Sequence, residues 1–322
     1  MKAIVFTTYG LPDVLQLKEV EKPTPNDNEV LIKVHAASIN SWDWELLKGT
    51  PFVNRLMFGL LKPKKINILG CDIAGRVEAV GKSVKKLQAG DEVFGDLSRC
   101  GWGGFAEYLC APEDVLTIKP AGMTFEQAAS IPQAALLALQ GLVDKGDVRH
   151  GQKVLINGAG GGAGTFAIQI AKSYGAEVTA VDNTSKLEMM RSLGANHVID
   201  YTQENYTRNG QAYDLIIDFS AYHSFFDYKR ALKAKGTFLM VGGSSGLANK
   251  CLFLGTFISM TSSKKMGLLL HKPNKGLARM IALVEDGKVK PVIDRCYPLS
   301  ETADAFRYFA TGNVQGKLVI RN

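Results

Sequence analysis

The sequence lacks the cysteine pattern of a disulfide framework or of a cysteine-rich zinc site. Its 322 residues include five cysteines, at positions 71, 100, 110, 251 and 296, and no two have C-x-x-C spacing. Long apolar runs are also missing, because the most apolar late stretch, residues 251–260, is shorter than the roughly 20 residues of a membrane span. The first residues alternate like a strand and show no apolar signal core. These absences predict a cytoplasmic protein with reduced thiols and no membrane span.

The sequence has no large excess of positive or negative charge. The chain carries 38 Lys and Arg against 31 Asp and Glu, a formal net charge of +7. The densest basic cluster consists of Lys62, Lys64 and Lys65, with Arg55 nearby, and no aromatic residue is interleaved within it. We therefore do not predict a nucleic-acid partner. A solvated loop is the simplest interpretation of the cluster, and contact with an anionic cofactor or a membrane surface is left open.

Two kinds of patterning divide the chain. Hydrophobic residues make up 46% and charged residues 21% of the composition, as in ordinary globular proteins. Short strand-like segments, at residues 2–6, 13–20 and 29–37 and onward to about 122, predict a compact antiparallel barrel or sandwich. From residue 153 apolar strands alternate with helices, which predicts parallel βαβ units. The fold class is therefore predicted to be α/β.

A glycine-rich turn links the first of these apolar strands to a helix. Residues 157–164 read NGAGGGAG. Such a turn presents backbone N–H groups and the positive end of the helix dipole to an anion. Glycine is needed because a Cβ would block a pyrophosphate. The frame Ala159-x-Gly161-x-x-Gly164 fits a dinucleotide turn, and Gly158-x-Gly160-x-x-Ala163 is a second frame. We predict cofactor contacts at Gly160, Gly161, Gly162, Ala163 and Gly164.

The choice between NAD and NADP depends on the end of the next strand. Asp182 stands there, 18 residues after Gly164. An acid at this position accepts from the ribose 2′-OH and favours NAD(H). The residues that follow it supply amide, hydroxyl and ammonium donors that suit a phosphate. They are Asn183, Thr184, Ser185 and Lys186. We predict NADP(H), with NAD(H) as the alternative.

Several segments, taken in order, resemble the medium-chain dehydrogenase/reductase superfamily, in its zinc-independent quinone oxidoreductase and enone reductase branch. They are AASINSWDW, GCDIAGRVEAVGKSV, AGDEVFG, GGFAEY, the glycine turn, SLGANHVIDY and GKLVI. The resemblance covers nearly the whole chain. It implies a GroES-like β domain, residues 1–122 and 288–322, and a Rossmann domain with a doubly wound parallel sheet, residues 123–287. The cofactor is expected in the cleft between them.

The resemblance also allows the metal ligands of zinc-dependent relatives to be compared with this chain. Their first, second and third ligand positions match Asn40, Cys71 and Gln133. Asn and Gln amides are poor ligands for zinc, which prefers Cys, His or carboxylate. Cys100 and Cys110 alone do not form the relatives' structural zinc lobe. We therefore predict no metal site.

Catalytic candidates follow from the same comparison. Asn40 matches a position that lines the active cleft, where its amide would donate to a substrate oxygen as negative charge develops. Asp43 and Asp72 match acids near that cleft. A turn-capping role for Asn40 and structural hydrogen bonds for the two acids are the alternatives. Cys71 is interpreted as a small buried side chain.

Further cofactor contacts are expected outside the glycine turn. Tyr201 resembles a residue near the adenosine, and Lys317, in GKLVI, resembles one near the cofactor cleft. Core packing of the tyrosine and solvation of the lysine are the alternatives. The carboxyl ends of predicted parallel strands, where doubly wound sheets bind ligands, add Ser220, Val241, Gly242 and Gly243.

The predicted activity is hydride transfer from NADPH to a quinone or to an α,β-unsaturated carbonyl, without zinc. The alternative is a catalytically silent NADP-binding sensor or scaffold on the same fold, since fold does not fix function. Leu137, which stands where many relatives carry a threonine, favours that alternative, as does the absence of an evident proton donor. A homodimer is expected, through an apolar edge strand such as TFLMV, residues 237–241.

Overall fold

The computed structural model describes the whole chain except Lys65. For residues 256 and 257 it describes the backbone but not the side chains. Lys65, part of the predicted basic cluster, therefore lies outside the described residues. The chain divides into two compact units. The first comprises residues 1–133, 273–275 and 293–322, and the second comprises residues 134–272 and 276–292.

The first unit is built on antiparallel strands. A two-stranded sheet joins β1 to β2, and a seven-stranded sheet has the order β14-β15-β3-β4-β5-β7, with β6 also paired to β3. The pair β14 and β15 is parallel. The strands are β1 (Lys2–Val5), β2 (Gln16–Glu19), β3 (Glu29–Ser38), β4 (Asp72–Val80), β5 (Glu92–Asp96), β6 (Tyr108–Pro112), β7 (Thr117–Ile118), β14 (Ile293–Pro298) and β15 (Lys317–Arg321).

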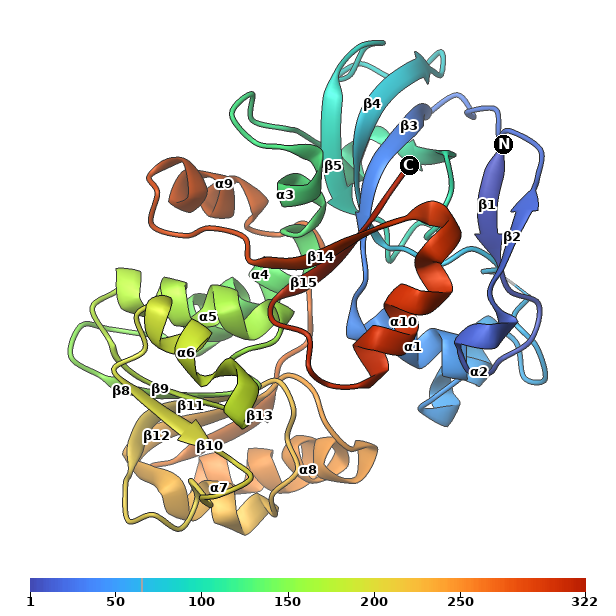
Figure 1. The fold of residues 1–322 in the computed structure, drawn as a ribbon. Helices are drawn as coiled ribbons and strands as arrows, with labels where there is room; N and C mark the ends of the chain where they lie inside the picture. The colour runs from blue at the N-terminus through green and yellow to red at the C-terminus, as the bar shows by residue number, and fades with distance from the viewer. Residues whose placement is uncertain (65) are drawn as a thin grey trace. The chain divides into compact units, whose positions relative to one another are not determined.

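Four helices accompany these strands (Figure 1): α1 (Ser41–Lys48), α2 (Phe52–Phe58), α3 (Phe125–Ala129) and α10 (Thr302–Ala310). The last strand of the chain, β15, pairs with β3 near its start. The predicted strand at 13–20 is shorter than expected, because Pro12 opens a 3₁₀ turn, Pro12–Val14, before β2 begins. Proline favours such a turn since its ring fixes φ and it lacks an N–H.

The second unit is a parallel sheet covered by helices. Its six strands have the order β10-β9-β8-β11-β12-β13, which is the doubly wound order of dinucleotide-binding sheets. Helices α5 and α6 lie on one face, and α7 and α8 lie on the other (Figure 1). The strands are β8 (Lys153–Asn157), β9 (Glu177–Asp182), β10 (His197–Asp200), β11 (Tyr213–Asp218), β12 (Leu232–Met240) and β13 (Lys265–Leu268).

The described part of the second unit also contains six α-helices, of which α8 is the longest. They are α4 (Pro132–Leu139), α5 (Gly162–Ser173), α6 (Leu187–Ser192), α7 (Phe225–Ala231), α8 (Ser245–Thr261) and α9 (Leu277–Glu285). Residues 237–240 of the TFLMV segment belong to β12, which lies between β11 and β13. That segment is therefore an interior strand and not the expected edge, and β13 occupies the edge. Phe238 and Met240 are accordingly in the buried core.

The unit boundary falls later than the sequence predicted. We placed it at residue 122, whereas the first compact unit runs to residue 133. The reason is α3, which packs against β3 and β4 of the first unit. Similarly, the chain rejoins the first unit at residue 293 rather than at 288.

Candidate functional site

The glycine turn lies at the carboxyl end of β8 and opens α5. Gly158 has φ +73°, and Gly161 precedes the first helical residue as the N-cap. A Cβ built on Gly164 would lie 2.2 Å from the Gly158 carbonyl oxygen. Gly164 is thus the glycine that allows close packing of helix against strand, as the frame Ala159-x-Gly161-x-x-Gly164 requires. The first N–H groups of α5 have no acceptor within the helix and suit a pyrophosphate.

Asp182 is bonded within the protein. Its Oδ2 accepts from the Gly160 N–H at 2.9 Å, and its Oδ1 accepts from the Asn183 N–H at 2.9 Å. The ammonium of Lys186 lies 3.1 Å from Oδ1, and both side chains of this pair are buried. The two residues that the sequence presented as rival signals, an acid for NAD and a cation for NADP, are therefore paired with each other.

The polar residues after β9 form a 3₁₀ turn, Thr184–Lys186, capped by Asn183, whose Oδ1 accepts from the Ser185 N–H at 3.1 Å. Thr184 and Ser185 are exposed. Tyr201, just after β10, lies with its ring centroid 6.0 Å from that of Tyr222, and both rings are partly exposed. Sequence reasoning missed Tyr222. The only signal was its place in the loop that follows β11.

The ends of β11 and β12 are organised by Asp218, which sequence reasoning also missed. Its Oδ1 accepts from Asn157 Nδ2 at 2.8 Å and from the Ser220 N–H at 2.9 Å. Its backbone carbonyl accepts from Val241 at 2.8 Å, and Gly243 is bridged to Ala221. Burial raises the pKa of Asp218 above its usual range. These contacts bring the predicted residues Ser220, Val241, Gly242 and Gly243 to one edge of the sheet.

In the first unit, Asn40 and Asp43 stand at the start of α1. The Asn40 N–H donates to Asp43 Oδ2 at 2.8 Å, and the Gly70 N–H donates to Asp43 Oδ1 at 2.8 Å. Asp43 is fully buried, and this burial raises its pKa to about 7. Both oxygens of this predicted catalytic acid thus bond to backbone, and its catalytic role stays a prediction.

The Asn40 side chain links a buried cation to a buried acid. Its Oδ1 accepts from Lys317 Nζ, which also donates to the Ile39 carbonyl at 3.0 Å. Its Nδ2 donates to Asp72 Oδ2 at 3.0 Å and lies 3.5 Å from Cys71 Sγ. Lys317 was expected near the cofactor, and the structure places it in this cluster instead of on the solvated surface. Its contact with cofactor stays a prediction.

Gln133 completes the cluster. Its N–H donates to both oxygens of Asp72, at 3.2 Å and 3.0 Å, and its Nε2 lies 3.6 Å from Cys71 Sγ. Burial raises the pKa of Asp72 and of Cys71 well above their usual ranges. Burial also lowers the pKa of Lys317, while the nearby Asp72 opposes that change. The cluster is therefore a desolvated cation held among acids and amides.

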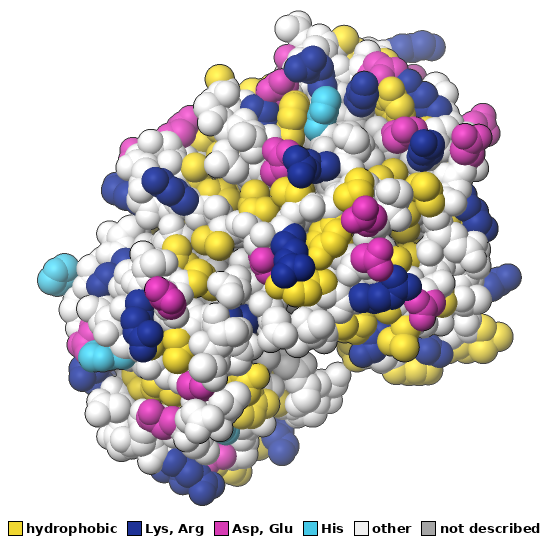
Figure 2. Space-filling view, viewed as in Figure 1, with side chains coloured by type: hydrophobic (Ala, Val, Ile, Leu, Met, Phe, Trp, Pro, Cys, Tyr) yellow, Lys and Arg dark blue, Asp and Glu magenta, His cyan; other side chains and the backbone are white. Residues whose placement is uncertain are grey.

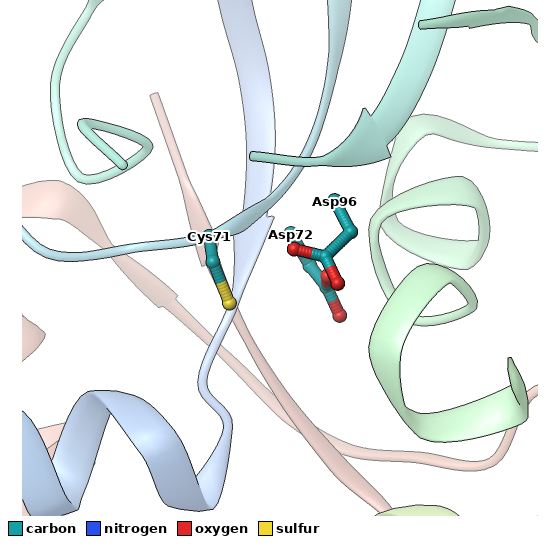
Figure 3. Close-up of side chains that lie close together, drawn as sticks. All are labelled: Cys71, Asp72 and Asp96. Atoms are coloured by element: carbon teal, nitrogen blue, oxygen red, sulfur yellow. The ribbon is translucent and has the colours of Figure 1, made fainter. Parts of the chain in front are cut away.

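One group of potential metal ligands exists among the residues that the structure describes. It consists of Cys71, Asp72 and Asp96, whose ligand atoms all lie within 4.8 Å of one another. Figure 3 shows the two carboxyl groups together beside the sulfur. Asp72 and Asp96 are directly opposed in the antiparallel pair of β4 and β5, so their side chains share one face.

This donor set does not fit a zinc ion. Asp72 already accepts from the Asn40 amide and the Gln133 N–H, and the amide side chains beside it are poor zinc ligands. Lys317 Nζ is bonded to Asn40 in the same buried cluster. Burial lowers the pKa of Lys317, and the nearby acids oppose that change.

Comparison with known protein families gives three matches along the chain. Residues 26–121 match the alcohol dehydrogenase GroES-like domain, and residues 193–320 match the family described as zinc-binding dehydrogenase. Residues 134–219 match the alanine dehydrogenase/PNT C-terminal domain. Together these matches cover both compact units.

Individual relatives extend over the full chain. A chloroplast envelope quinone oxidoreductase homolog of Arabidopsis thaliana is 33% identical, covering 99% of this chain and 98% of the relative. A 2-methylene-furan-3-one reductase of Solanum lycopersicum is 36% identical over 99% of this chain and 79% of its own length. The solved quinone oxidoreductase of Coxiella burnetii superposes with a TM-score of 0.90 at 33% identity, covering 100% of this chain and 99% of that one.

The structure bears on whether the chain crosses a membrane. Among the described residues, no helix is both long and apolar enough to cross a bilayer. Relatives named for chloroplasts occur among the matches, so the predicted cytoplasmic location stays a prediction.

Proposed function

The chain belongs to the medium-chain dehydrogenase/reductase superfamily and is an oxidoreductase with a nucleotide-binding fold; from that premise we propose that it is an NADPH-dependent reductase of quinones or α,β-unsaturated carbonyls that works without zinc. The observation that carries the proposal is the buried cluster of Asn40, Asp72 and Lys317, in which the Asn40 amide bonds the lysine Nζ on one side and the Asp72 carboxyl on the other. The name of one relative, an NADPH-dependent alkenal/one oxidoreductase, agrees with this activity.

The cofactor proposal rests on the charge around β9. Asp182 is neutralised by Lys186 and holds the Gly160 N–H, so this acid has fewer lone pairs left for a ribose hydroxyl. The hydroxyl groups of the exposed Thr184 and Ser185 lie beside it and donate to Asp200 Oδ2 and Asn183 Oδ1. By turning to a bound 2′-phosphate, these donors would suit it better than a bare carboxylate does. Bound NADPH supplies the hydride, and Gly161 and the start of α5 hold its pyrophosphate.

Tyr201 and Tyr222 are proposed to contact the adenosine. Both rings are partly exposed and their centroids lie 6.0 Å apart. Aromatic faces of this kind stack on nucleobases, a contact worth about 1–3 kcal/mol per base. Ser220 and the segment Val241–Gly243 line the adjoining strand ends.

Negative charge develops on the acceptor oxygen after hydride arrives, whether the product is a hydroquinone anion or an enolate. A positioned amide donor at that oxygen contributes about 2.7–4 kcal/mol. Asn40 is our candidate for this donor, and Lys317, bonded to its Oδ1, orients and polarises the amide. The Asn40 Nδ2 has two hydrogens, and the one that contacts Cys71 Sγ at 3.5 Å would turn to the substrate while the bond to Asp72 is kept. The final proton is assigned to solvent.

A turnover screen tests the proposal. The purified protein is mixed with NADPH or NADH and with quinones, enals and enones, and cofactor oxidation is followed by absorbance. Turnover with NADPH on at least one acceptor class is expected. Cofactor binding without turnover on all of them would instead indicate the silent sensor or scaffold.

A separate measurement tests the preference for NADPH over NADH. Dissociation constants for NADPH and NADH are compared in the wild type and in Lys186→Met. We expect tighter NADPH binding in the wild type and a larger loss for NADPH than for NADH in the variant. NADH binding about ten-fold tighter, a difference of about 1.4 kcal/mol, would overturn the assignment.

We also propose that the protein is a homodimer. Strand β13 forms one edge of the parallel sheet, and edge strands can pair with those of another chain. Light scattering is expected to give twice the monomer mass of 34.9 kDa. A mass equal to that of the monomer would refute it.

A further inference from the structure

A group of large apolar side chains is exposed on one short segment of the first unit. The segment comprises α2 and the residues just after it, and we call its apolar side chains the 52–61 surface. Leu61 is 87% exposed and Leu56 is 65% exposed. The members are Phe52, Val53, Leu56, Met57, Leu60 and Leu61. Exposed apolar side chains that gather in this way mark an interaction site more often than isolated ones do.

The helix geometry places these side chains together. Phe52 and Leu56 are four residues apart, as are Val53 and Met57, so the four share one face of α2. Asn54, on the other side of the helix, is buried and its Nδ2 donates to the Thr50 carbonyl at 2.9 Å. The apolar face of α2 is therefore exposed to solvent, while the buried Asn54 on the opposite side attaches the helix to the rest of the first unit.

Two further contacts hold this segment to the first unit. Tyr9 donates its hydroxyl to the Gly59 carbonyl at 2.7 Å, and Arg55 Nε donates to the Gly49 carbonyl at 3.1 Å. The guanidinium of Arg55 also lies over the Tyr9 ring. The 52–61 surface thus belongs to a structured part of the fold.

The chain segment that carries the 52–61 surface has charged side chains of one sign only. Residues 46–71 contain no Asp or Glu, whereas they include Lys48, Arg55, Lys62, Lys64 and Lys65. Lys62 and Lys64 are exposed directly after the apolar residues. Figure 2 shows hydrophobic side chains beside Lys and Arg side chains at the lower right, in the region where Figure 1 places α2.

We propose that residues 52–64 dock this protein on an anionic membrane surface. Apolar side chains next to lysines are the combination that binds a lipid interface, since the apolar groups enter the acyl boundary and the cations face the headgroups. Each Lys or Arg near an anionic bilayer adds to the attraction. A second copy of this chain carries the same positive charge on this face, so self-docking would bring like charges together.

Co-sedimentation with lipid vesicles tests the proposal, without cofactor or substrate, so that its result is independent of the proposed activity. The full chain is mixed with vesicles of phosphatidylglycerol and phosphatidylcholine in equal parts, and separately with vesicles of phosphatidylcholine alone. Binding to the anionic vesicles is expected, with a loss on adding salt because exposed charges are screened. Absence of binding to the anionic vesicles would overturn the proposal.

Two double variants with matched controls locate the surface. Lys62→Glu/Lys64→Glu is expected to lower the partition coefficient at least about ten-fold, while Lys18→Glu/Lys82→Glu, a charge change of equal size at exposed lysines of the same unit, retains much more binding. Leu56→Ser/Leu61→Ser is expected to weaken binding more than Leu11→Ser/Leu17→Ser, which also removes exposed leucines.

Thermal unfolding confirms that each variant is folded before its binding is compared. Equal losses in the test and control variants would show that binding follows net charge or general apolarity, and would overturn the assignment to this surface. Loss of dimer mass in Leu56→Ser/Leu61→Ser, with vesicle binding intact, would assign the surface to a second copy and would also overturn it.

Discussion

Asn40 is the residue on which the first unit's polar cluster converges, because its amide bonds Lys317 on one side and Asp72 on the other. We expect Asn40→Ala to lower turnover on small quinones or enals at least about ten-fold, as loss of an oxyanion donor does. Cofactor affinity is expected to change little. Initial rates and NADPH titration measure the two effects.

Gln133→Ala is the matched control for that variant. Its side-chain amide contacts Cys71 only at 3.6 Å, whereas its bond to Asp72 comes from the backbone and survives the substitution. We expect a smaller loss of turnover in this variant. If folded Asn40→Ala turns over like the wild type, Asn40 is a structural residue and another group stabilises the oxyanion.

Asp43 makes the stability of the first unit depend on pH. Its pKa is about 7 in the folded protein, against an ordinary value of 3.8. Since the folded state retains the proton to higher pH, the free energy of unfolding falls as pH rises between these two values. Relative to Asp43→Asn, we expect the wild type to lose about 2.6 kcal/mol between about pH 5 and about pH 8.

Urea denaturation of both proteins across this range measures that difference. Asp43→Asn has no carboxyl to titrate at this position, so contributions from other groups cancel in the comparison. Parallel pH profiles for the two proteins would show that Asp43 is ionised throughout, held by its bonds from the Asn40 and Gly70 N–H groups.

For single residues, the sequence predicts which side chains belong to the candidate site better than it predicts their hydrogen-bond partners. The resemblance was enough to place Asn40, Cys71 and Asp72 near the active cleft. It did not predict the bond from Lys317 to Asn40, which joins residues 277 positions apart. Nothing local in GKLVI indicates that its lysine is buried. Asp218 escaped notice for a similar reason, since its role depends on Asn157 and Ser220 meeting at one sheet edge.

The glycine turn is the element in which sequence and structure agree most closely, and two of its glycines have different roles. A Cβ on Gly164 would lie 2.2 Å from a backbone oxygen, so Gly164→Ala is expected to destabilise the fold by about 1–3 kcal/mol. A Cβ on Gly161 would lie 3.4 Å from the same oxygen. Gly161→Ala is therefore expected to fold normally.

The same pair separates binding from folding. Gly161→Ala places a methyl group where the pyrophosphate approaches the turn, so we expect NADPH affinity to fall at least about ten-fold, or about 1.4 kcal/mol. Calorimetric titration and thermal unfolding of both variants provide the measurement. Wild-type NADPH affinity in Gly161→Ala would place the cofactor away from this turn.

Element boundaries were less predictable than element types. The alternation of strand and helix after residue 153 was sufficient to predict parallel βαβ units, but it did not give the order of strands. An apolar strand such as β12 has the same composition whether it lies inside the sheet or at its edge. Its position follows from pairing with both β11 and β13, which is tertiary information.

For the whole molecule, the return of the chain to its first unit is the least local feature. Pairing of β15 with β3 joins the end of the chain to residues 36–38, and no periodicity in either segment indicates its partner. That arrangement was available from resemblance alone. It is also what carries Lys317 to Asn40, so the candidate site depends on the closure of the first unit.

The metal requirement is the final whole-molecule prediction. Amide side chains at two of the ligand positions, and an ammonium bonded to one of them, leave Asp72, Asp96 and the Cys71 thiol as the remaining donors. We therefore expect that dialysis against a chelator leaves turnover unchanged and that elemental analysis finds zinc well below one ion per chain. Stoichiometric zinc that is lost together with activity, and restored with it, would contradict the zinc-independent reaction.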